Sequence, residues 1–198
     1  MRSSLAASRG QHASASALDK EVTIYIGGVH VTDHPEVVRT LLGSCISVCL
    51  HDPVTQVGGM NHFMLPHRVG DGDAEDLTRF GVHAMDCLIG TMMKLGGDRR
   101  RFVAKFFGGA HVLNIREAAA GVPQQNITFI RSFLAAEGFR ILAEDVGGYH
   151  PRNVRFYTAS GRALVKRVEG ANARSRLLTQ EQQQPAQPPK FGDVVLFE

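Results

Sequence analysis

Short apolar runs that end in paired glycines are the feature that most limits the fold of this chain. Each run has the length and residue content of a β-strand. Glycine adopts positive φ angles that other residues avoid, so a glycine pair at the end of a run marks a sharp turn. The chain must therefore fold around sheets of short strands. The runs are 22–26, 102–107 and 139–146, and they end at Gly27-Gly28, Gly108-Gly109 and Gly147-Gly148.

Two segments have the periodicity of amphipathic helices, and each is followed by glycine. Two pairs of strand-like runs are separated by turn residues and predict β-hairpins. Because strands outnumber helices and hairpins are frequent, we predict an α+β fold with mixed or antiparallel β-sheets. The predicted helices span 77–95 and 123–137, and the predicted hairpins join 45–50 to 57–65 and 154–159 to 163–168.

Length and composition predict one packed domain. The chain has 198 residues, of which 43% are hydrophobic, enough for a single core over residues 21–170. Residues 1–20 are rich in Ser and Ala and lack the apolar stretch of a secretory signal, so we expect a disordered tail. The Gln/Pro-rich residues 171–190 should form a flexible segment, and residues 191–198 provide an apolar end able to pack back onto the domain.

Charge and special residues exclude several classes. The formal net charge of +3 indicates by itself neither a nucleic-acid nor a membrane partner. No run approaches the roughly 18 apolar residues of a membrane span. Three cysteines do not make a disulfide framework and fit a reducing, cytoplasmic compartment. The nine histidines are scattered, without a C-x-x-C pair or an H-E-x-x-H helix, so we expect no structural zinc.

Cys45 and His62 form the combination with the clearest chemical meaning. Residues 52–55 (Asp-Pro-Val-Thr) indicate the turn of the first hairpin. If Asp52 faces Thr55, then Cys45 faces His62 on the same side of the sheet, with Cβ atoms about 4.5–5.5 Å apart. An imidazole at that position lowers the pKa of a thiol and can protonate a leaving amine. The pair therefore predicts a cysteine nucleophile with a histidine base.

The residues near Cys45 fit this interpretation. Gly43-Ser44 is a small-residue turn, at which the backbone N–H groups of Ser44 and Cys45 can converge on an oxyanion. Cys49 shares the strand face but lies roughly 13 Å away, too far for a disulfide. We interpret Cys49 as a core residue, and also Cys87, which lies near the apolar face of the first helix. From the local residues alone, a buried cysteine that faces a core histidine stays an open alternative.

Several ordered stretches resemble one known family. The most specific is Leu-Gly-Ser-Cys at 42–45 with a histidine seventeen residues after the cysteine. This pattern resembles the CheD family, whose members are bacterial and archaeal chemotaxis proteins that deamidate glutamines of chemoreceptors. The similarity covers about residues 21–170 and the C-terminal end. The matching stretches are 40–45, 58–66, 81–85, 104–110, 144–148 and 192–197.

The resemblance implies a role for each site residue. Cys45 takes the nucleophile position and His62 the general-base position. Thr40 is the candidate for the family's third residue, although in some members the threonine stands one position earlier, where this chain has Arg39. The implied reaction is hydrolysis of a glutamine side chain through a thioester, without metal or organic cofactor. The implied fold resembles deamidating bacterial toxins, with sheets packed as a sandwich and helices outside.

The resemblance also implies partners and leaves two other functions open. The partners are the cytoplasmic helices of methyl-accepting chemoreceptors and a CheC-type phosphatase. A non-catalytic binding module is one alternative, but the presence of both Cys45 and His62 argues against it. A protease or transglutaminase would use the same two residues on another substrate. Residues 150–176 carry seven Lys or Arg against one acid, which indicates either a docking face for acidic helices or a solvated surface; interleaved aromatics typical of nucleic-acid binding are few.

Overall fold

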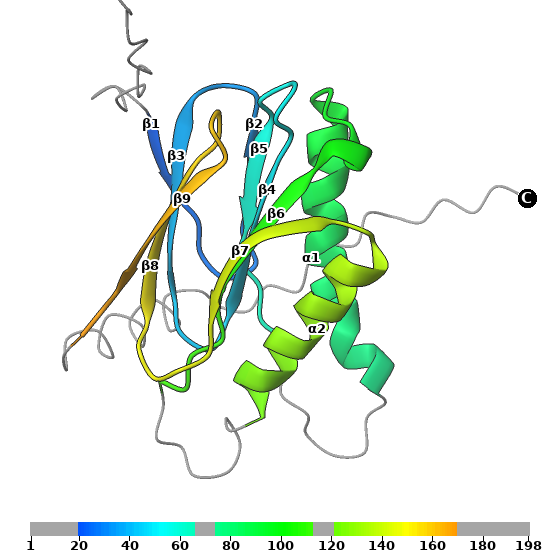
Figure 1. The fold of residues 1–198 in the computed structure, drawn as a ribbon. Coiled ribbons are helices and arrows are strands. Elements are labelled where there is room, and N and C mark those ends of the chain that lie inside the picture. Colours follow the sequence, from blue (N-terminus) through cyan, green and yellow to red (C-terminus); the bar gives the residue numbers. More distant parts are fainter. Residues whose placement is uncertain (1–19, 66–73, 113–120, 170–198) are drawn as a thin grey trace, which may run out of the picture.

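The computed structural model describes residues 20–65, 74–112 and 121–169, which form two β-sheets and two α-helices. The two sheets pack face to face, and both helices lie on the outer side of the larger sheet (Figure 1). The predicted α+β sandwich with external helices is thereby confirmed. The predictions for the N-terminal tail, the Gln/Pro-rich segment and the apolar end concern residues outside the described ranges, apart from Lys20, which begins the first strand.

Both sheets are mixed. The smaller sheet has the order β1-β3-β8-β9 and the larger one the order β2-β5-β4-β6-β7. The pairs β1–β3 and β6–β7 are parallel, and all other pairs are antiparallel. The strands of the smaller sheet are β1 (Lys20–Thr23), β3 (Glu36–Leu42), β8 (Arg152–Tyr157) and β9 (Arg162–Arg167). Those of the larger sheet are β2 (Val29–Thr32), β4 (Ile46–His51), β5 (Gly58–Asn61), β6 (Val103–Gly108) and β7 (Arg140–Val146).

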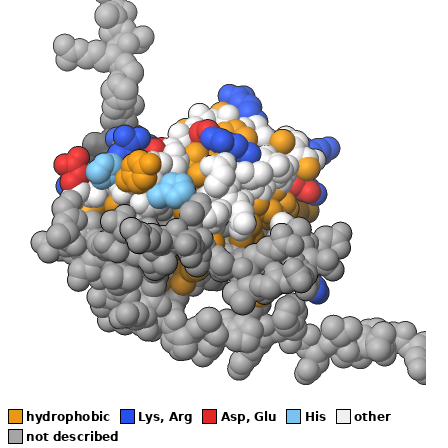
Figure 2. All heavy atoms as spheres, turned by 90° about the horizontal axis from the view of Figure 1, so that it is seen from below, with side chains coloured by type: hydrophobic (Ala, Val, Ile, Leu, Met, Phe, Trp, Pro, Cys, Tyr) orange, Lys and Arg blue, Asp and Glu red, His pale blue; other side chains and the backbone are white. Residues whose placement is uncertain are grey.

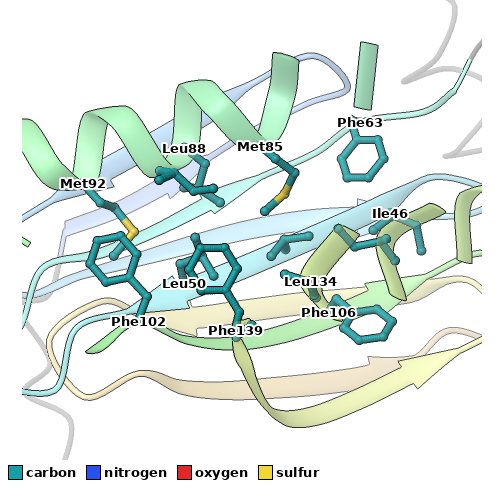
Figure 3. Close-up of a cluster of buried hydrophobic side chains, with 14 of the residues drawn as sticks. Ile46, Leu50, Phe63, Met85, Leu88, Met92, Phe102, Phe106, Leu134 and Phe139 are labelled. Atoms are coloured by element: carbon teal, nitrogen blue, oxygen red, sulfur yellow. The ribbon is translucent and has the colours of Figure 1, made fainter. Parts of the chain in front are cut away.

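The helices cover the larger sheet with one amphipathic face each. They are α1 (Ala74–Lys94) and α2 (Val122–Ala136), and a 3₁₀ turn, Arg99–Arg101, precedes β6. Figure 3 shows Met85, Leu88 and Met92 of α1 packed over the aromatic and aliphatic side chains of the sheet. Each helix was predicted from its periodicity to within a few residues of its observed ends. None of the helices in the described ranges is long and apolar enough to cross a membrane.

The central strand β4 separates two hydrophobic cores. Ile46, Val48 and Leu50 face the helices, whereas Cys49 faces the smaller sheet. All six residues of β4 are buried, because one face is covered by helices and the other by a sheet. Successive side chains of a strand point to opposite faces, so the run Ile-Ser-Val-Cys-Leu-His divides its side chains between the two cores. Cys49 is thus a core residue, as predicted.

Two strands, β2 and β3, were not predicted. β2 has only four residues and includes His30, while β3 includes Glu36 and Arg39, so neither shows a clean apolar alternation. The charged residues are accommodated by pairing, since His30 Nε2 lies 2.6 Å from Glu36 Oε2. β3 is nevertheless an interior strand of its sheet, held between β1 and β8. Tertiary pairing, and not local composition, makes these segments strands.

The predicted register of the first hairpin is wrong by two residues. Cys49 faces Met60 and His51 faces Gly58, so Asp52 faces Val57 and not Thr55. The Asp52 N–H donates to the Val57 carbonyl at 2.9 Å, and the Gln56 N–H donates to the Asp52 carbonyl at 2.9 Å. The loop therefore has four residues, with Gln56 in the left-handed region at φ 60°. A two-residue type I turn would oppose the twist of the strands, so the longer loop is preferred.

Asp52 holds this loop to the rest of the domain. Its carboxylate is fully buried and accepts hydrogen bonds from Arg101 Nη2 at 2.6 Å and Nε at 3.0 Å. The N–H groups of Asp98 and Val54 donate to it as well, each at 2.9 Å. Burial alone would raise the pKa of Asp52, but these hydrogen bonds outweigh it and hold the pKa well below its usual range. The carboxylate stays ionised at all but strongly acidic pH.

We predict that Asp52→Asn lowers the free energy of unfolding at neutral pH by about 1–3 kcal/mol, because an amide cannot accept from all of these donors. The pKa of Asp52 is depressed in the folded state, so its contribution is present above the unfolded value of 3.8 and is lost as the pH falls. Urea unfolding at neutral and at acidic pH measures this, and the gap between variant and wild type should narrow in acid. Asp33→Asn, at a half-exposed carboxylate, is the control. A gap that is independent of pH would contradict the assignment.

Candidate active site

The backbone of Cys45 is held by the second glycine pair. Cys45 lies directly before β4, in the bend that connects β3 to β4. Its carbonyl accepts a hydrogen bond from the Gly109 N–H at 2.8 Å, and the Gly43 carbonyl accepts one from the Ala110 N–H at 2.8 Å. Gly108 has φ 118°, and a Cβ at this position would collide with the Cys45 carbonyl oxygen. Only glycine allows the end of β6 to approach the cysteine this closely.

The first glycine pair holds the backbone of His62. The His62 N–H donates to the Gly28 carbonyl at 2.9 Å, and the Gly27 N–H donates to the His62 carbonyl at 2.7 Å. These bonds extend the β2–β5 ladder by one residue beyond Asn61, which faces Val29. The backbone N–H and C=O of His62 are therefore both held, and this fixes the point from which the imidazole extends.

Cys45 and His62 lie diagonally across the sheet and not directly opposite each other. The next residues along the chain, Ile46 and Phe63, exchange two backbone hydrogen bonds of 2.9 Å each. In this register Cys45 faces Met64, and His62 lies two residues before Met64 on the same side of the sheet. Diagonal neighbours are about 7–8 Å apart, closer at Cβ, and remain within reach of a long or aromatic side chain. The structure thus places both residues on one face, although through a different pairing than predicted.

Thr40 fixes the tautomer of His62. The Thr40 hydroxyl donates to the Ile24 carbonyl at 2.8 Å and lies 2.8 Å from His62 Nδ1. A hydroxyl has one proton, which is used on the carbonyl, so the hydroxyl oxygen accepts a hydrogen bond from Nδ1–H. The lone pair of the neutral ring is then on Nε2. Within the described part of the chain, Nε2 is buried and has no hydrogen-bond partner.

Burial keeps the imidazole of His62 neutral. Desolvation lowers the pKa of His62 from 6.5 to about 3, so the ring is uncharged at neutral pH. All three predicted catalytic side chains, Thr40, Cys45 and His62, are almost completely buried. A neutral imidazole can accept a proton from a thiol, whereas an imidazolium cannot.

The other two cysteines have different environments. Burial raises the pKa of Cys49 far above its ordinary value, which keeps it a thiol. Cys87 on α1 is only partly buried, and its Sγ lies 3.5 Å from His83 Nε2 one helical turn away. The prediction that Cys87 packs in the core is therefore wrong. Exposed residues lie on the same helical turn as Cys87. The periodicity of the sequence was too approximate to show that Cys87 lies at the edge of the apolar face and not within it.

Two buried asparagines on the helix side of the larger sheet, next to the segments of Cys45 and His62, were missed by the sequence analysis. Asn126 of α2 donates from Nδ2 to the Ser44 carbonyl at 2.9 Å and accepts at Oδ1 from the Leu65 N–H at 2.8 Å. Asn61 accepts at Oδ1 from the Val48 N–H at 2.9 Å. The signal for Asn126 was present in the sequence. It occupies one position of the buried stripe of α2, together with Ile130 and Leu134 at helical spacing.

The third glycine pair lies beside the second. The Gly147 N–H donates to the Gly108 carbonyl at 2.9 Å, and the His111 N–H donates to the Gly148 carbonyl at 2.8 Å. All three glycine pairs thus make tight connections around one end of the larger sheet. Figure 2 views the molecule from this end and shows histidine side chains next to a hydrophobic one. The rings of His111 and Tyr149 lie 6.1 Å apart, and Tyr149 is 77% exposed.

The predicted basic face of residues 150–176 is partly neutralised. Arg152 is buried and pairs with Asp145 at 2.8 Å, and Arg167 also reaches Asp145 at 3.1 Å. Arg155 pairs with Glu21 at 2.6 Å. Within the described residues, this segment therefore carries less free charge than its composition suggests. Among the same residues, no three His, Cys, Asp or Glu side chains are grouped so as to hold a metal ion.

Comparison with known proteins identifies relatives of one kind. The family described as CheD chemotactic sensory transduction matches residues 64–167. A protein named probable chemoreceptor glutamine deamidase CheD from Sinorhizobium medicae is 41% identical over 186 residues, which cover 93% of this chain and 99% of the relative. A coverage this high includes the segment with Thr40, Cys45 and His62.

Relatives from other bacteria carry the same name. The one from Hahella chejuensis is 39% identical over 176 residues, or 86% of this chain and 82% of the relative. The one from Burkholderia vietnamiensis is 45% identical over 158 residues, or 77% of this chain and 64% of the relative, so this chain spans less than two thirds of that protein. The family match extends over more than half of the sequence, and the alignment with the Sinorhizobium relative is nearly end to end. The chain belongs to the CheD family.

Proposed function

We propose that this protein is a cytoplasmic chemoreceptor glutamine deamidase that uses Cys45 as nucleophile and His62 as general base. The observation that carries the proposal is the hydrogen bond between Thr40 and His62 Nδ1: with Nδ1–H donating to Thr40, the lone pair of the ring is on the unpartnered Nε2, on the sheet face that Cys45 shares. Relatives of similar length carry the name of this activity. The substrate is the side-chain carboxamide of a glutamine on the cytoplasmic helices of a chemoreceptor.

In the first half-reaction Cys45 is acylated. His62 Nε2 takes the thiol proton while Sγ attacks the carboxamide carbon, and a tetrahedral oxyanion forms. The N–H of Cys45, with that of Ser44, is the proposed donor to this oxygen. The C–N bond then breaks, and the imidazolium returns the proton to the departing nitrogen. One carboxamide and one thiol are converted into one thioester and one ammonia.

In the second half-reaction water releases the product. His62, neutral again, takes a proton from water as its oxygen attacks the thioester carbon. The C–S bond breaks, and the imidazolium protonates the sulfur. One thioester and one water give one glutamate side chain and the free thiol. The new negative charge on a receptor helix changes the electrostatics of the receptor bundle and so biases its signalling state.

Thr40 supports both half-reactions by position and not by contact with the substrate. Its hydroxyl is held in turn by the Ile24 carbonyl, so the imidazole cannot rotate without breaking a buried hydrogen bond. This arrangement supports Thr40, and not Arg39, as the third residue of the site. Arg39 points to the opposite face of β3, where its Nε lies 3.0 Å from Glu21 Oε1.

We predict that the wild-type chain converts specific glutamines of a chemoreceptor cytoplasmic fragment into glutamates with release of ammonia, and that Cys45→Ser abolishes the conversion, because the nucleophilic sulfur is lost. Peptide mass spectrometry of the receptor fragment, with a coupled ammonia assay, measures this. Cys49→Ala is the matched control, on the same face of the same segment, and should retain activity.

Other outcomes would identify other functions. A receptor fragment that stays bound but keeps its mass with the wild-type chain would overturn the deamidase proposal in favour of a binding module, whose further partner is a CheC-type phosphatase. Cleaved backbone would indicate a protease, and cross-linked product a transglutaminase. Equal activity of Cys45→Ser and wild type would remove Cys45 from the mechanism.

We predict that Thr40→Val lowers kcat by about 10- to 100-fold, a part of the roughly 10²–10⁴-fold that a positioned acid–base group supplies. Valine has nearly the shape of threonine but cannot accept from His62 Nδ1–H, so the ring loses its fixed tautomer. Thr40→Ser keeps the hydroxyl and should recover most of the activity. Steady-state deamidation kinetics measure both variants. An increase in KM with unchanged kcat in Thr40→Val, or no recovery of activity in Thr40→Ser, would contradict this role.

We predict that kcat/KM does not fall in acid with a midpoint near pH 6.5, the ordinary pKa of histidine. Because burial lowers the pKa of His62 to about 3, its neutral form, which is the base, persists as the pH falls through the weakly acidic range. Deamidation rates across neutral and weakly acidic pH measure this, with circular dichroism at each pH to verify folding. A wild-type rate that halves near pH 6.5 while the protein stays folded would show that His62 is not the buried neutral base.

A further inference from the structure

Asn126 reaches the backbone of the nucleophile from the helix layer. Its side chain is completely buried, and both ends of the amide are used. Nδ2 donates to the Ser44 carbonyl at 2.9 Å, and Oδ1 accepts from the Leu65 N–H at 2.8 Å. The partners define the orientation of the amide, since a carbonyl only accepts and an N–H only donates. One side chain therefore holds both the residue before Cys45 and the segment that follows His62.

The Ser44 carbonyl belongs to the same rigid unit as the Cys45 N–H. The peptide bond between the two residues is trans and planar, so C=O and N–H point in opposite directions. α2 packs on the helix side of the larger sheet, whereas the Cys45 side chain belongs to the core between the two sheets. A Ser44 carbonyl held toward α2 therefore turns the Cys45 N–H away from the helix, to the side of the thiol.

We propose that Asn126 is a positioning residue of the oxyanion site, which acts by orienting and polarising the Cys45 N–H. A hydrogen bond accepted by the carbonyl of a peptide unit strengthens the donor at its other end. A donor that is already aimed before the reaction costs no reorganisation when the oxyanion forms. The second bond, to Leu65, prevents the amide from rotating away from Ser44. The inference deepens the proposed function, because it concerns the tetrahedral intermediate of the same acyl transfer.

Two small reagents separate this role from general support of the fold. p-Nitrophenyl acetate acylates Cys45: the S–C bond forms, the ester C–O bond breaks, and p-nitrophenolate leaves through a tetrahedral oxyanion. Iodoacetamide alkylates the same thiol by direct displacement of iodide, and no oxyanion forms. A positioning residue of the oxyanion site matters for the first reaction alone. Support for Cys45 and His62 in general would matter for both.

The experiment compares Asn126→Ala with wild type in the 198-residue chain, both in a Cys87→Ser background so that the partly exposed thiol does not react. We expect the acylation rate to fall at least about tenfold, less than the roughly 10²–10³-fold that follows loss of a direct donor, while alkylation changes less than about threefold. Gln124→Ala, on the exposed face of the same helix, is the control and should change neither rate.

A second variant keeps the size of the side chain in case alanine unfolds the protein. In Asn126→Asp, a protonated carboxyl group can donate to the Ser44 carbonyl as the amide does, whereas an ionised one repels it. The acylation rate of this variant relative to wild type should therefore rise as the pH is lowered, and the relative alkylation rate should stay constant. Recovery of both reactions together would indicate restored folding and overturn the inference.

The outcomes also separate this inference from the proposed function. Equal losses in acylation and alkylation, or no loss in acylation, would overturn the role of Asn126. The ester needs no receptor, so the comparison remains informative even if the wild type fails to deamidate any receptor fragment. In that case the proposed substrate is wrong, but a selective loss of acylation in the variants still assigns Asn126 to the oxyanion site. If the wild type deamidates a receptor and the Asn126 variants are acylated as fast as wild type, the proposed function stands and the role of Asn126 is wrong.

Discussion

The hydrogen bond between Thr40 and His62 joins the two sheets at the site. Thr40 lies on β3 of the smaller sheet, and His62 follows β5 of the larger one, yet their side chains meet at 2.8 Å. Packed sheets lie about 10 Å apart. Side chains from the two sheets can bridge this distance only when the sheets are packed against each other. The orientation of the His62 imidazole therefore depends on complete folding of the domain. The hydrogen bond that defines its tautomer exists only in the native state.

Polar side chains in the core between the sheets lower the stability of the fold unless their donors and acceptors are paired. Buried donors and acceptors are almost always paired, and an unpaired one lowers stability. The Thr40 hydroxyl is paired twice and His62 Nδ1 once. In the described ranges, the buried side-chain atoms without a partner are His62 Nε2 and Arg152 Nε. Nε2 is the atom that general-base chemistry requires to be unoccupied, so the unpartnered nitrogen agrees with the proposed role of His62.

The parts of the fold that could be predicted are those that local patterns determine. The periodicity of α1 and α2 and the largely apolar run of β4 led to correct assignments, because burial selects these patterns directly. β3 was missed because Glu36 and Arg39 interrupt its alternation, and distant strands supply their partners. The register of the first hairpin was wrong because the Asp52 side chain, held by Arg101, stabilises a longer loop. The likeness of the sandwich to deamidating toxins stays a prediction.

The sequence led to candidate site residues but not to the geometry around them. Cys45 and His62 were predicted as nucleophile and base through a wrong register, the resemblance to a family added Thr40, and these roles stay predictions. What local sequence could not supply is how backbone from distant segments converges. In the sequence, the glycine pairs indicated only the ends of strands. In the structure, the Gly27 N–H also donates to the His62 carbonyl and the Gly109 N–H to the Cys45 carbonyl. Because each close approach leaves no room for a Cβ or needs positive φ, the same residues that end the strands determine where the backbones of Cys45 and His62 lie. The glycine pairs therefore serve turn and site together, and a substitution at Gly108 would displace the Cys45 carbonyl before it affected any side chain of the site.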